Sequence, residues 1–347
     1  MAEQPAIFDL GSRAPTVRMI ALRVRQDGPE SAFDQAKLRA DAARYQEVTC
    51  RSALNSVKGM PFNWTLNPYR GCTHGCHYCF ARRYQTQFEL GPGDEFSSMI
   101  FVKINLIEML KRELDHPSWT REQVAVGTAT DPYQPIEGHY KLTRRALEAL
   151  HAGRTPIGLV TKGPMIVRDM DILADMGRAS GATVYMSVPS VDERAWLTLE
   201  PGTASPLQRL RAVKQLCEAG VRAGVLMAPI VPGFTSEPKQ LEATIKAIAD
   251  HGAAFVGVNV MYLKGGTKDH FLGFIAREHP HMLEGLERLY RSAYAPAPYV
   301  SSIRAMVDTL QRRHDVGRRP EISTGPEQEP RRRTRDGPGG EQAVFEW

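Results

Sequence analysis

Short apolar segments alternate with amphipathic segments over most of this 347-residue chain. The apolar segments predict six strands: Phe62 to Tyr69, Val124 to Gly127, Ile157 to Thr161, Thr183 to Val188, Ala223 to Ile230 and Phe255 to Tyr262. The segments between them predict helices at Leu106 to Leu114, Leu142 to Ala152, Val167 to Met176, Leu207 to Ala219 and Leu241 to His251. Strands that alternate with helices form parallel β/α units, so we expect an α/β fold with too few units for a complete eight-fold barrel.

The two ends of the chain differ from this repeating region. Before residue 61, the Ala and Arg content favours a single helix from Ser31 to Gln46, in an extension (1–60) that packs on the core (61–270) or frays. Helices are predicted again at Met282 to Tyr290 and Tyr299 to Arg313, within a C-terminal extension (271–316). Residues 317–347 are rich in Pro, Gly, Glu and Arg, which predicts a disordered tail.

Composition narrows the possible functions. The hydrophobic content of 42% supports a large core, but no apolar run approaches the roughly 18 residues of a membrane span, and the N-terminus does not resemble a secretory signal. Five cysteines are too sparse, and an odd number, for a disulfide scaffold, so we expect a reducing, cytoplasmic location. The net charge of +5 is compatible with a nucleic-acid substrate. The Arg331 to Arg335 run lies in a nearly neutral tail, which favours a solvated segment over a nucleic-acid-binding arm.

Three of the cysteines, Cys72, Cys76 and Cys79, lie in one short loop. Thiolates are the ligands that iron–sulfur clusters require, and this spacing lets one loop surround one cluster. Three ligands leave one iron of a [4Fe–4S] cluster open to bind a small molecule. A structural zinc site with His74 or His77 as the fourth ligand is the alternative. The remaining two cysteines, Cys50 and Cys217, are interpreted as buried or core thiols.

Polar side chains follow each of the next strands. The segments are Gly127-Thr-Ala-Thr-Asp-Pro-Tyr-Gln-Pro-Ile-Glu137, Thr161-Lys-Gly163, Ser187-Val-Pro189 and Met227-Ala-Pro-Ile-Val-Pro-Gly233. In parallel barrels such segments meet at one end of the strands, where functional residues collect. Hydroxyls, amides and a lysine there suit a ligand with a ribose, a carboxylate and an adenine. For Thr130 or Ser187 taken alone, ordinary capping or turn chemistry explains the residue equally well.

The loop Cys-x3-Cys-x2-Cys, with Tyr78 before its last cysteine, resembles the cluster loop of radical S-adenosylmethionine (SAM) enzymes. Together with Thr-Asp-Pro-Tyr-Gln-Pro-x-Glu, Thr-Lys, Leu-Glu-Pro at 199–201 and Ala-Pro-Ile-x-Pro-Gly, it is similar to the spore photoproduct lyase-like group over roughly residues 60–265. The resemblance implies a partial (β/α)6 TIM-type barrel with helical N- and C-terminal extensions. It also implies reductive cleavage of SAM by a [4Fe–4S] cluster to a 5′-deoxyadenosyl radical. The partners we expect are an electron donor such as flavodoxin or ferredoxin and a nucleic-acid substrate, and we expect a monomer.

The same resemblance assigns roles to residues. Cys72, Cys76 and Cys79 ligate the cluster; Tyr78, Thr130, Lys162 and Ser187 contact SAM, with Asp131 beside them; the backbone of Ala228 meets the adenine. The Gly-Gly-Glu segment common in the superfamily is missing, and Gly-Thr-Ala-Thr-Asp stands in its place.

One position departs from the group. Spore photoproduct lyases carry a hydrogen-donating cysteine where this chain has Thr128, and a threonine O–H bond is too strong for that role. Tyr133 or Tyr140 is the remaining candidate donor near the substrate, with a packing role as the alternative. The substrate is therefore left open among DNA, RNA and a protein side chain. The alternative from another class is a non-catalytic protein that uses the cysteine loop for electron transfer or structure.

Overall fold

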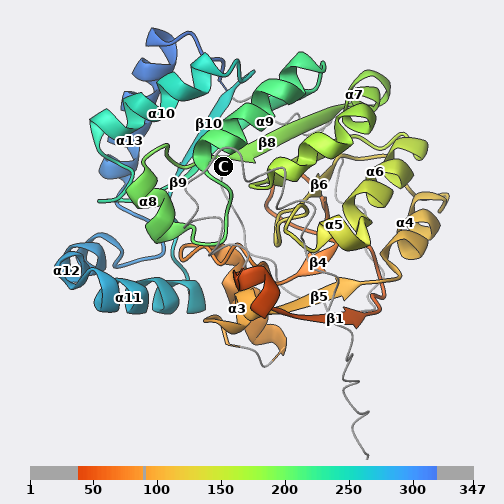
Figure 1. Cartoon of the computed structure of the whole chain (residues 1–347), viewed down its shortest axis with the longest axis horizontal. Helices are drawn as coiled ribbons and strands as arrows, with labels where there is room; N and C mark the ends of the chain where they lie inside the picture. Colours follow the sequence, from red (N-terminus) through yellow and green to blue (C-terminus); the bar gives the residue numbers. More distant parts are fainter. Residues whose placement is uncertain (1–37, 89–90, 319–347) are drawn as a thin grey trace, which may run out of the picture.

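A sheet of seven strands forms the centre of the protein (Figure 1). The structure is a computed structural model that describes residues 38–88 and 91–318. Six strands run parallel in chain order, and β2 pairs antiparallel at one end. They are β2 (Leu54–Ser56), β3 (Trp64–Leu66), β6 (Val124–Val126), β7 (Ile157–Thr161), β8 (Ala182–Ser187), β9 (Arg222–Ile230) and β10 (Val256–Val260). The six predicted parallel strands are confirmed, except that the segment expected as one strand from Phe62 to Tyr69 ends in the main sheet at Leu66.

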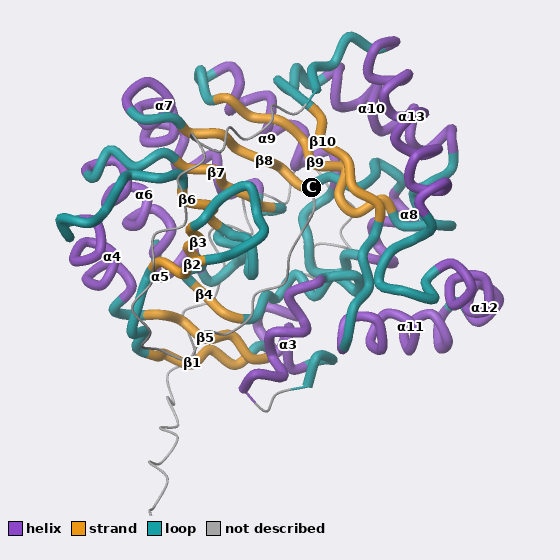
Figure 2. Tube along the Cα trace, turned by 180° about the vertical axis from the view of Figure 1, so that it is seen from behind, coloured by secondary structure: helices purple, strands orange, loops and turns teal. Residues whose placement is uncertain are grey.

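Helices between the strands cover the outside of the sheet, as Figures 1 and 2 show. They are α4 (Leu106–Leu114), α6 (Leu142–Ala152), α7 (Met170–Ala179), α9 (Pro206–Glu218) and α10 (Pro238–Asp250). Each such helix covers the sheet with an apolar face. In helix α9 this face includes Leu210, Val213 and Leu216, which recur at a spacing of three and are fully buried. The helix begins at Pro206 because Ser205 and Gln208 form a capping box.

The strands form a partial barrel. Among residues 38–88 and 91–318, the end strands β2 and β10 do not pair with each other. The segment after α13 (Ala297–Arg313) lies along the outer edge of β10, where the Val256 N–H donates to the Gly317 carbonyl at 2.8 Å. This arrangement confirms the expected partial (β/α)6 fold.

A second sheet, not anticipated from the sequence, lies beside the first. It consists of β1 (Arg44–Val48), β5 (Met99–Lys103) and β4 (Tyr69–Arg70), with β5 in the middle. The helix predicted from Ser31 to Gln46 is therefore wrong from Arg44 onward: the described part is helical over 38–42 and then becomes β1. Pairing with β5 in register outweighs the local helix preference. Strand β4 leads directly into the cysteine loop.

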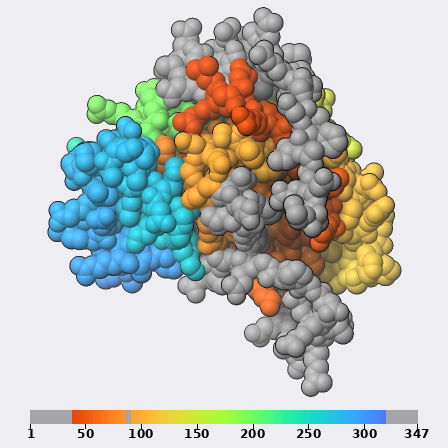
Figure 3. All heavy atoms as spheres, turned by 90° about the horizontal axis from the view of Figure 1, so that it is seen from below, coloured from red at the N-terminus to blue at the C-terminus, as the bar shows by residue number. Residues whose placement is uncertain are grey.

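The remaining elements are η1 (Phe80–Phe88), α3 (Glu95–Ser98), α5 (Glu137–Tyr140), η2 (Pro164–Asp169), α8 (Glu193–Leu199), α11 (Gly266–Glu278), α12 (Pro280–Leu289) and α13 (Ala297–Arg313). Helix α13 packs beside α10 and against β10, and α11 packs against α12 and η1, the helix after the cysteine loop. The two predicted C-terminal helices correspond to α12 and α13, whereas α11 was not predicted. Figure 3 shows this C-terminal part in blue beside the orange segment that follows the cysteine loop, where the Thr267 hydroxyl donates to the Cys79 carbonyl at 3.3 Å.

Residues 319–347 of the predicted tail lie outside the described residues, and the proposed domain limits stay a prediction. In the part of the chain that the structure describes, none of the helices combines the length and the apolar character needed to cross a membrane.

Candidate active site

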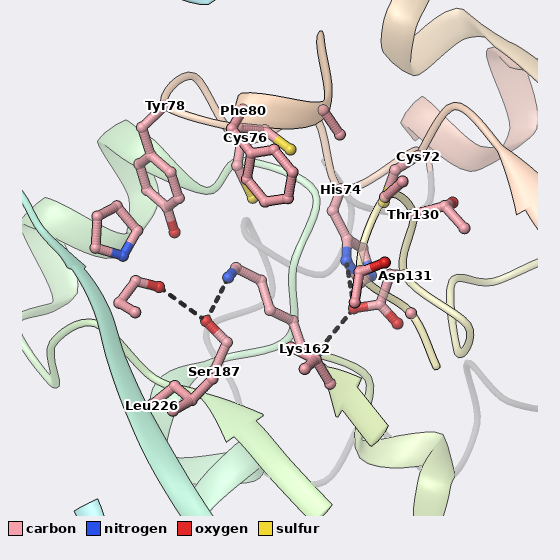
Figure 4. A pocket seen from close by; sticks show the side chains of 18 of the residues that line it. Cys72, His74, Cys76, Tyr78, Phe80, Thr130, Asp131, Lys162, Ser187 and Leu226 are labelled. Atoms are coloured by element: carbon pink, nitrogen blue, oxygen red, sulfur yellow. Dashed lines mark hydrogen bonds and ion pairs between the residues drawn. The ribbon is translucent and has the colours of Figure 1, made fainter. Parts of the chain in front are cut away.

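The cysteine loop follows β4 and turns at two glycines. Gly71 and Gly75 have φ values of +77° and +62°, a backbone region that other residues rarely adopt. A Cβ at Gly71 would also lie 2.5 Å from the Met99 carbonyl oxygen, so the first turn requires glycine. All three loop cysteines line one cavity at the open end of the strands, and Figure 4 labels Cys72 and Cys76 there. Two of them are buried and Cys79 is partly exposed.

A buried arginine, Arg82, is hydrogen-bonded to the backbone of the cysteine loop. Arg82 is 2% exposed and donates to the carbonyls of Gly75 at 2.8 Å and Cys76 at 3.0 Å. The same guanidinium donates to the Gly93 carbonyl at 2.7 Å and lies over the Phe96 ring. These bonds hold the Gly75–Cys76 part of the loop backbone next to a permanent positive charge. Sequence reasoning missed Arg82, because nothing in its immediate neighbourhood in the sequence distinguishes it from a surface arginine.

The surroundings of the thiols suit an iron–sulfur cluster. Burial raises the pKa of all three cysteines, and that of Cys76 to about 12. Such sulfurs are costly to ionise alone, but they are suitable ligands once a cationic group replaces their protons. The donor set therefore fits a cluster held by one thiolate on each of three irons.

The geometry does not resemble a zinc site. Within 38–88 and 91–318, no three His, Cys, Asp or Glu side chains converge on a point that could hold a single metal ion. His77, one proposed fourth ligand, stacks on Phe274 with ring centroids 3.8 Å apart and lies 3.3 Å from the His270 ring nitrogen. His74, the other, faces the cavity, where its Nδ1 is 3.4 Å from the Asp131 carboxylate. Both histidines thus have partners other than the cysteines.

The loop after β6 carries Asp131, which joins three parts of the site. Its carboxylate accepts hydrogen bonds from the Thr161 hydroxyl at 2.6 Å and the Lys162 N–H at 2.6 Å, and it faces His74 (Figure 4). Burial alone would raise the pKa of Asp131, but His74 and these hydrogen bonds outweigh burial and lower that pKa to about 2. Asp131 therefore fixes the β6 loop to the end of β7, and its contact with SAM stays a prediction.

Thr130 also has partners within the chain. Its hydroxyl donates to the Gly71 carbonyl at 2.6 Å and accepts from the Gln134 side chain at 3.0 Å. Gln134 in turn accepts from the Thr73 N–H at 3.2 Å. Thr130 lines the cavity, but its hydroxyl connects the β6 loop to the cysteine loop.

Lys162, Ser187 and Ala228 come together at the ends of β7, β8 and β9. The Lys162 ammonium donates to the Ser187 hydroxyl at 2.6 Å, and that hydroxyl is 3.3 Å from the Ala228 carbonyl (Figure 4). The Lys162 side chain is 14% exposed and lies over the Tyr78 ring, 5.6 Å from its centroid. Four of the five residues assigned to direct SAM contact are therefore neighbours: Tyr78, Lys162, Ser187 and Ala228.

A carboxylate to which the sequence assigned no role lies behind this group. Glu200, of the Leu-Glu-Pro segment, accepts a hydrogen bond from the Tyr78 hydroxyl and forms an ion pair with Arg209. Its Oε1 is also 3.5 Å from the Lys162 ammonium. Burial alone would raise the pKa of Glu200, but Arg209 and Lys162 outweigh burial and lower that pKa to about 2. The available sequence signal for Glu200 was its place in the Leu-Glu-Pro segment of the family resemblance, whereas its burial and its partners are seen only in the structure.

The two tyrosines considered as hydrogen donors lie outside the cavity. Tyr133 is 2% exposed, and its hydroxyl donates to Asp169 at 2.9 Å. The Tyr140 hydroxyl donates to Glu47 at 2.7 Å in an exposed position. Thr128 does line the cavity. Apolar and aromatic side chains make up much of the remaining wall: Val57, Met60, Phe62, Phe80, Tyr84 and Tyr262.

Replacing Tyr133 by phenylalanine tests the placement of this hydroxyl. We expect Tyr133→Phe to lower the free energy of unfolding by roughly 1.5–3 kcal/mol, because a buried carboxylate loses a donor, and to leave SAM cleavage unchanged. Urea unfolding and quantified 5′-deoxyadenosine measure the two effects, with Tyr140→Phe as the exposed control. Unchanged stability together with altered product formation would instead place this hydroxyl in the reaction.

Comparison with known proteins assigns the family. The family model of the Radical SAM superfamily matches residues 66–248, more than half of the chain, so the protein belongs to this superfamily. It is therefore an enzyme, which removes support from the non-catalytic alternative. Membership implies SAM and an iron–sulfur cluster as cofactors.

Similar proteins include one match that is longer than the family model. An uncharacterised protein of Mycobacterium tuberculosis is 37% identical over 274 residues, which cover 78% of this chain and 81% of the relative. A protein of a Pseudomonas phage named radical SAM Nα-GlyT isomerase is 26% identical over 170 residues, or 49% of this chain and 33% of its own length.

The fold is that of spore photoproduct lyase. The solved structure of that enzyme with bound AdoMet and dinucleoside spore photoproduct matches with a TM-score of 0.61 and 15% sequence identity, covering 83% of this chain and 84% of the other. The motifs predicted a spore photoproduct lyase-like protein, and the shared fold confirms this prediction.

Proposed function

We propose that this protein holds a [4Fe–4S] cluster with Cys72, Cys76 and Cys79 and uses it to cleave SAM reductively. The observation that carries the proposal is one cavity that contains all three thiols and the polar ends of successive parallel strands. When bound, the cluster and SAM would supply a 5′-deoxyadenosyl radical, because one electron delivered to the sulfonium breaks its bond to the adenosyl carbon and methionine leaves. We further propose that flavodoxin or ferredoxin delivers that electron.

The chain's own residues bind and orient SAM in this proposal. Lys162 offers the cation that a carboxylate of the ligand requires, and Ser187 supplies a hydroxyl beside it. The aromatic face of Tyr78 and the backbone of Ala228 line the same cavity and suit the adenosyl part. Thr130 and Asp131 keep the β6 loop closed against the cysteine loop.

We infer a nucleic-acid substrate. Phe62, Phe80 and Tyr84 provide flat apolar surfaces on which a base can stack, and the cavity wall beyond the polar strand ends is otherwise uncharged. The fold shared with spore photoproduct lyase supports the same class. Thr128 in the position of the donor cysteine argues against spore-type thymine dimer repair as the reaction.

Anaerobic reconstitution tests the proposal. We expect about four irons per chain and conversion of SAM to 5′-deoxyadenosine under a strong reductant. Repeating the assay with intact and damaged DNA, RNA and deuterium-labelled SAM identifies the substrate and shows whether SAM is consumed or regenerated. Protein with a full complement of iron that cleaves no SAM would overturn the proposal.

A further inference from the structure

One buried carboxylate connects two residues that lie at the proposed SAM site. Glu200 is 3% exposed and does not itself line the cavity. The Tyr78 hydroxyl donates to its Oε1, and the Lys162 ammonium lies 3.5 Å from the same oxygen. Tyr78 comes from the cysteine loop and Lys162 from the end of β7, so Glu200 fixes the distance between two separate elements.

Arg209 holds this carboxylate in place. It is fully buried and pairs with the second oxygen of Glu200. The same guanidinium donates to the Ser187 carbonyl at 2.8 Å and the Ala204 carbonyl at 2.9 Å. Because the N–H groups of Arg209 donate to these fixed acceptors, the guanidinium holds Glu200 in one orientation and also anchors the backbone of Ser187.

The charges of this group leave one cation for the cavity. The Glu200 carboxylate and the Arg209 guanidinium cancel, whereas the charge of Lys162 does not. The ammonium donates one hydrogen bond to the Ser187 hydroxyl and lies 3.5 Å from Glu200, so it retains donor capacity for a ligand. Lys162 is thus presented to the cavity in a fixed orientation, without the rotamer entropy that a free lysine would lose on binding.

We propose that Glu200 is the positioning residue of the SAM site, acting through Lys162 and Tyr78 without touching the ligand. This inference rests on the proposed function. It predicts that loss of the carboxylate weakens SAM binding while the cysteines retain the cluster.

Glu200→Gln is the direct test. Glutamine has one acceptor oxygen in place of two, so it cannot serve Tyr78 and Lys162 on one side and Arg209 on the other. In anaerobically reconstituted protein we expect the dissociation constant for SAM, measured by calorimetry, to rise about tenfold. Iron content is expected to match that of the wild type.

A second variant is needed because Glu200→Gln leaves Arg209 as an unpaired buried charge, which threatens folding. The double variant Glu200→Gln with Arg209→Met removes both charges, and such replacements are often tolerated. We expect it to fold and to show the same weakened SAM binding, because Lys162 and Tyr78 have still lost the carboxylate that positions them.

Glu137→Gln is the matched control. Glu137 is also a fully buried glutamate that accepts from a tyrosine hydroxyl, that of Tyr69 at 2.6 Å, and pairs with an arginine, Arg168 at 2.7 Å, but it does not line the cavity. We expect it to lower stability without changing the SAM dissociation constant. The inference is overturned if the Glu200 variants bind SAM like the wild type, or if Glu137→Gln weakens binding equally. Wild-type protein that carries iron but binds no SAM overturns the proposed function instead.

Discussion

Alanine in place of Cys72, Cys76 or Cys79 is expected to remove the cluster and to reduce SAM cleavage below detection. A cluster with three protein ligands has no spare thiolate in the loop, so two cysteines leave a second iron without a protein ligand. The two remaining cysteines cannot substitute, because neither lines the cavity: the Cys217 thiol faces the Ala223 carbonyl at 3.3 Å, and the Cys50 N–H pairs with Asn105. Iron and sulfide content, visible absorption and 5′-deoxyadenosine yield measure the outcome.

Cys50→Ala and Cys217→Ala are the controls for this prediction. Both are expected to retain full iron and full activity, with at most a modest loss of stability from the packing of Cys217 against the core. An iron content that survives replacement of a loop cysteine but falls on replacement of Cys50 would assign the ligands differently.

The sequence predicted the six strands and the thiol group because these signals are local. A buried parallel strand is a continuous apolar run, and cluster ligands from one loop have a fixed spacing in the chain. The sheet of β1, β5 and β4 was not predicted, since β4 has only two residues and β1 depends on pairing with a strand more than 50 residues away.

For the polar residues at the strand ends, the sequence predicts their location but not their roles. Sequence reasoning located Thr130, Asp131 and Ser187 at one end of the barrel, and the structure brings them to one cavity. It could not separate residues that face a ligand from residues that hold the loops together. Asp131, in the loop after β6, accepts hydrogen bonds from Thr161 and Lys162 at the end of β7. These bonds depend on how the two segments meet in the fold, so neither segment's sequence alone predicts them.

Glu200 and Arg209 were missed as a functional pair for the same reason. They are nine residues apart, on either side of the start of α9. Their partners are the Tyr78 hydroxyl and the Ser187 carbonyl, which are distant in sequence. A charged pair is recognised as buried only after the cysteine loop has folded over it.

Gly202→Ala is expected to displace the cysteine loop from the segment that carries Glu200. Gly202 donates its N–H to the His74 carbonyl at 3.0 Å, so two backbones touch at this point. A Cβ would lie 2.4 Å from the Thr73 carbonyl oxygen and 2.8 Å from that of His74, and neither backbone atom can rotate away. We expect stability to fall by about 1–3 kcal/mol. A shift of about 1 Å between the loop and the SAM contacts is expected to reduce SAM cleavage by about 100-fold.

Gly177→Ala separates this effect from the general consequence of replacing a glycine. Gly177 lies in α7, where an added Cβ meets nothing within 4 Å, so alanine is expected to stabilise the helix by roughly 0.5–1 kcal/mol and to leave activity unchanged. Cluster content distinguishes two origins of the Gly202→Ala defect. Full iron with weak SAM cleavage indicates that the loop still binds the cluster but has moved away from Lys162 and Glu200. Wild-type activity in Gly202→Ala would mean that the loop and this segment can separate without consequence, so their contact would not determine the geometry of the site.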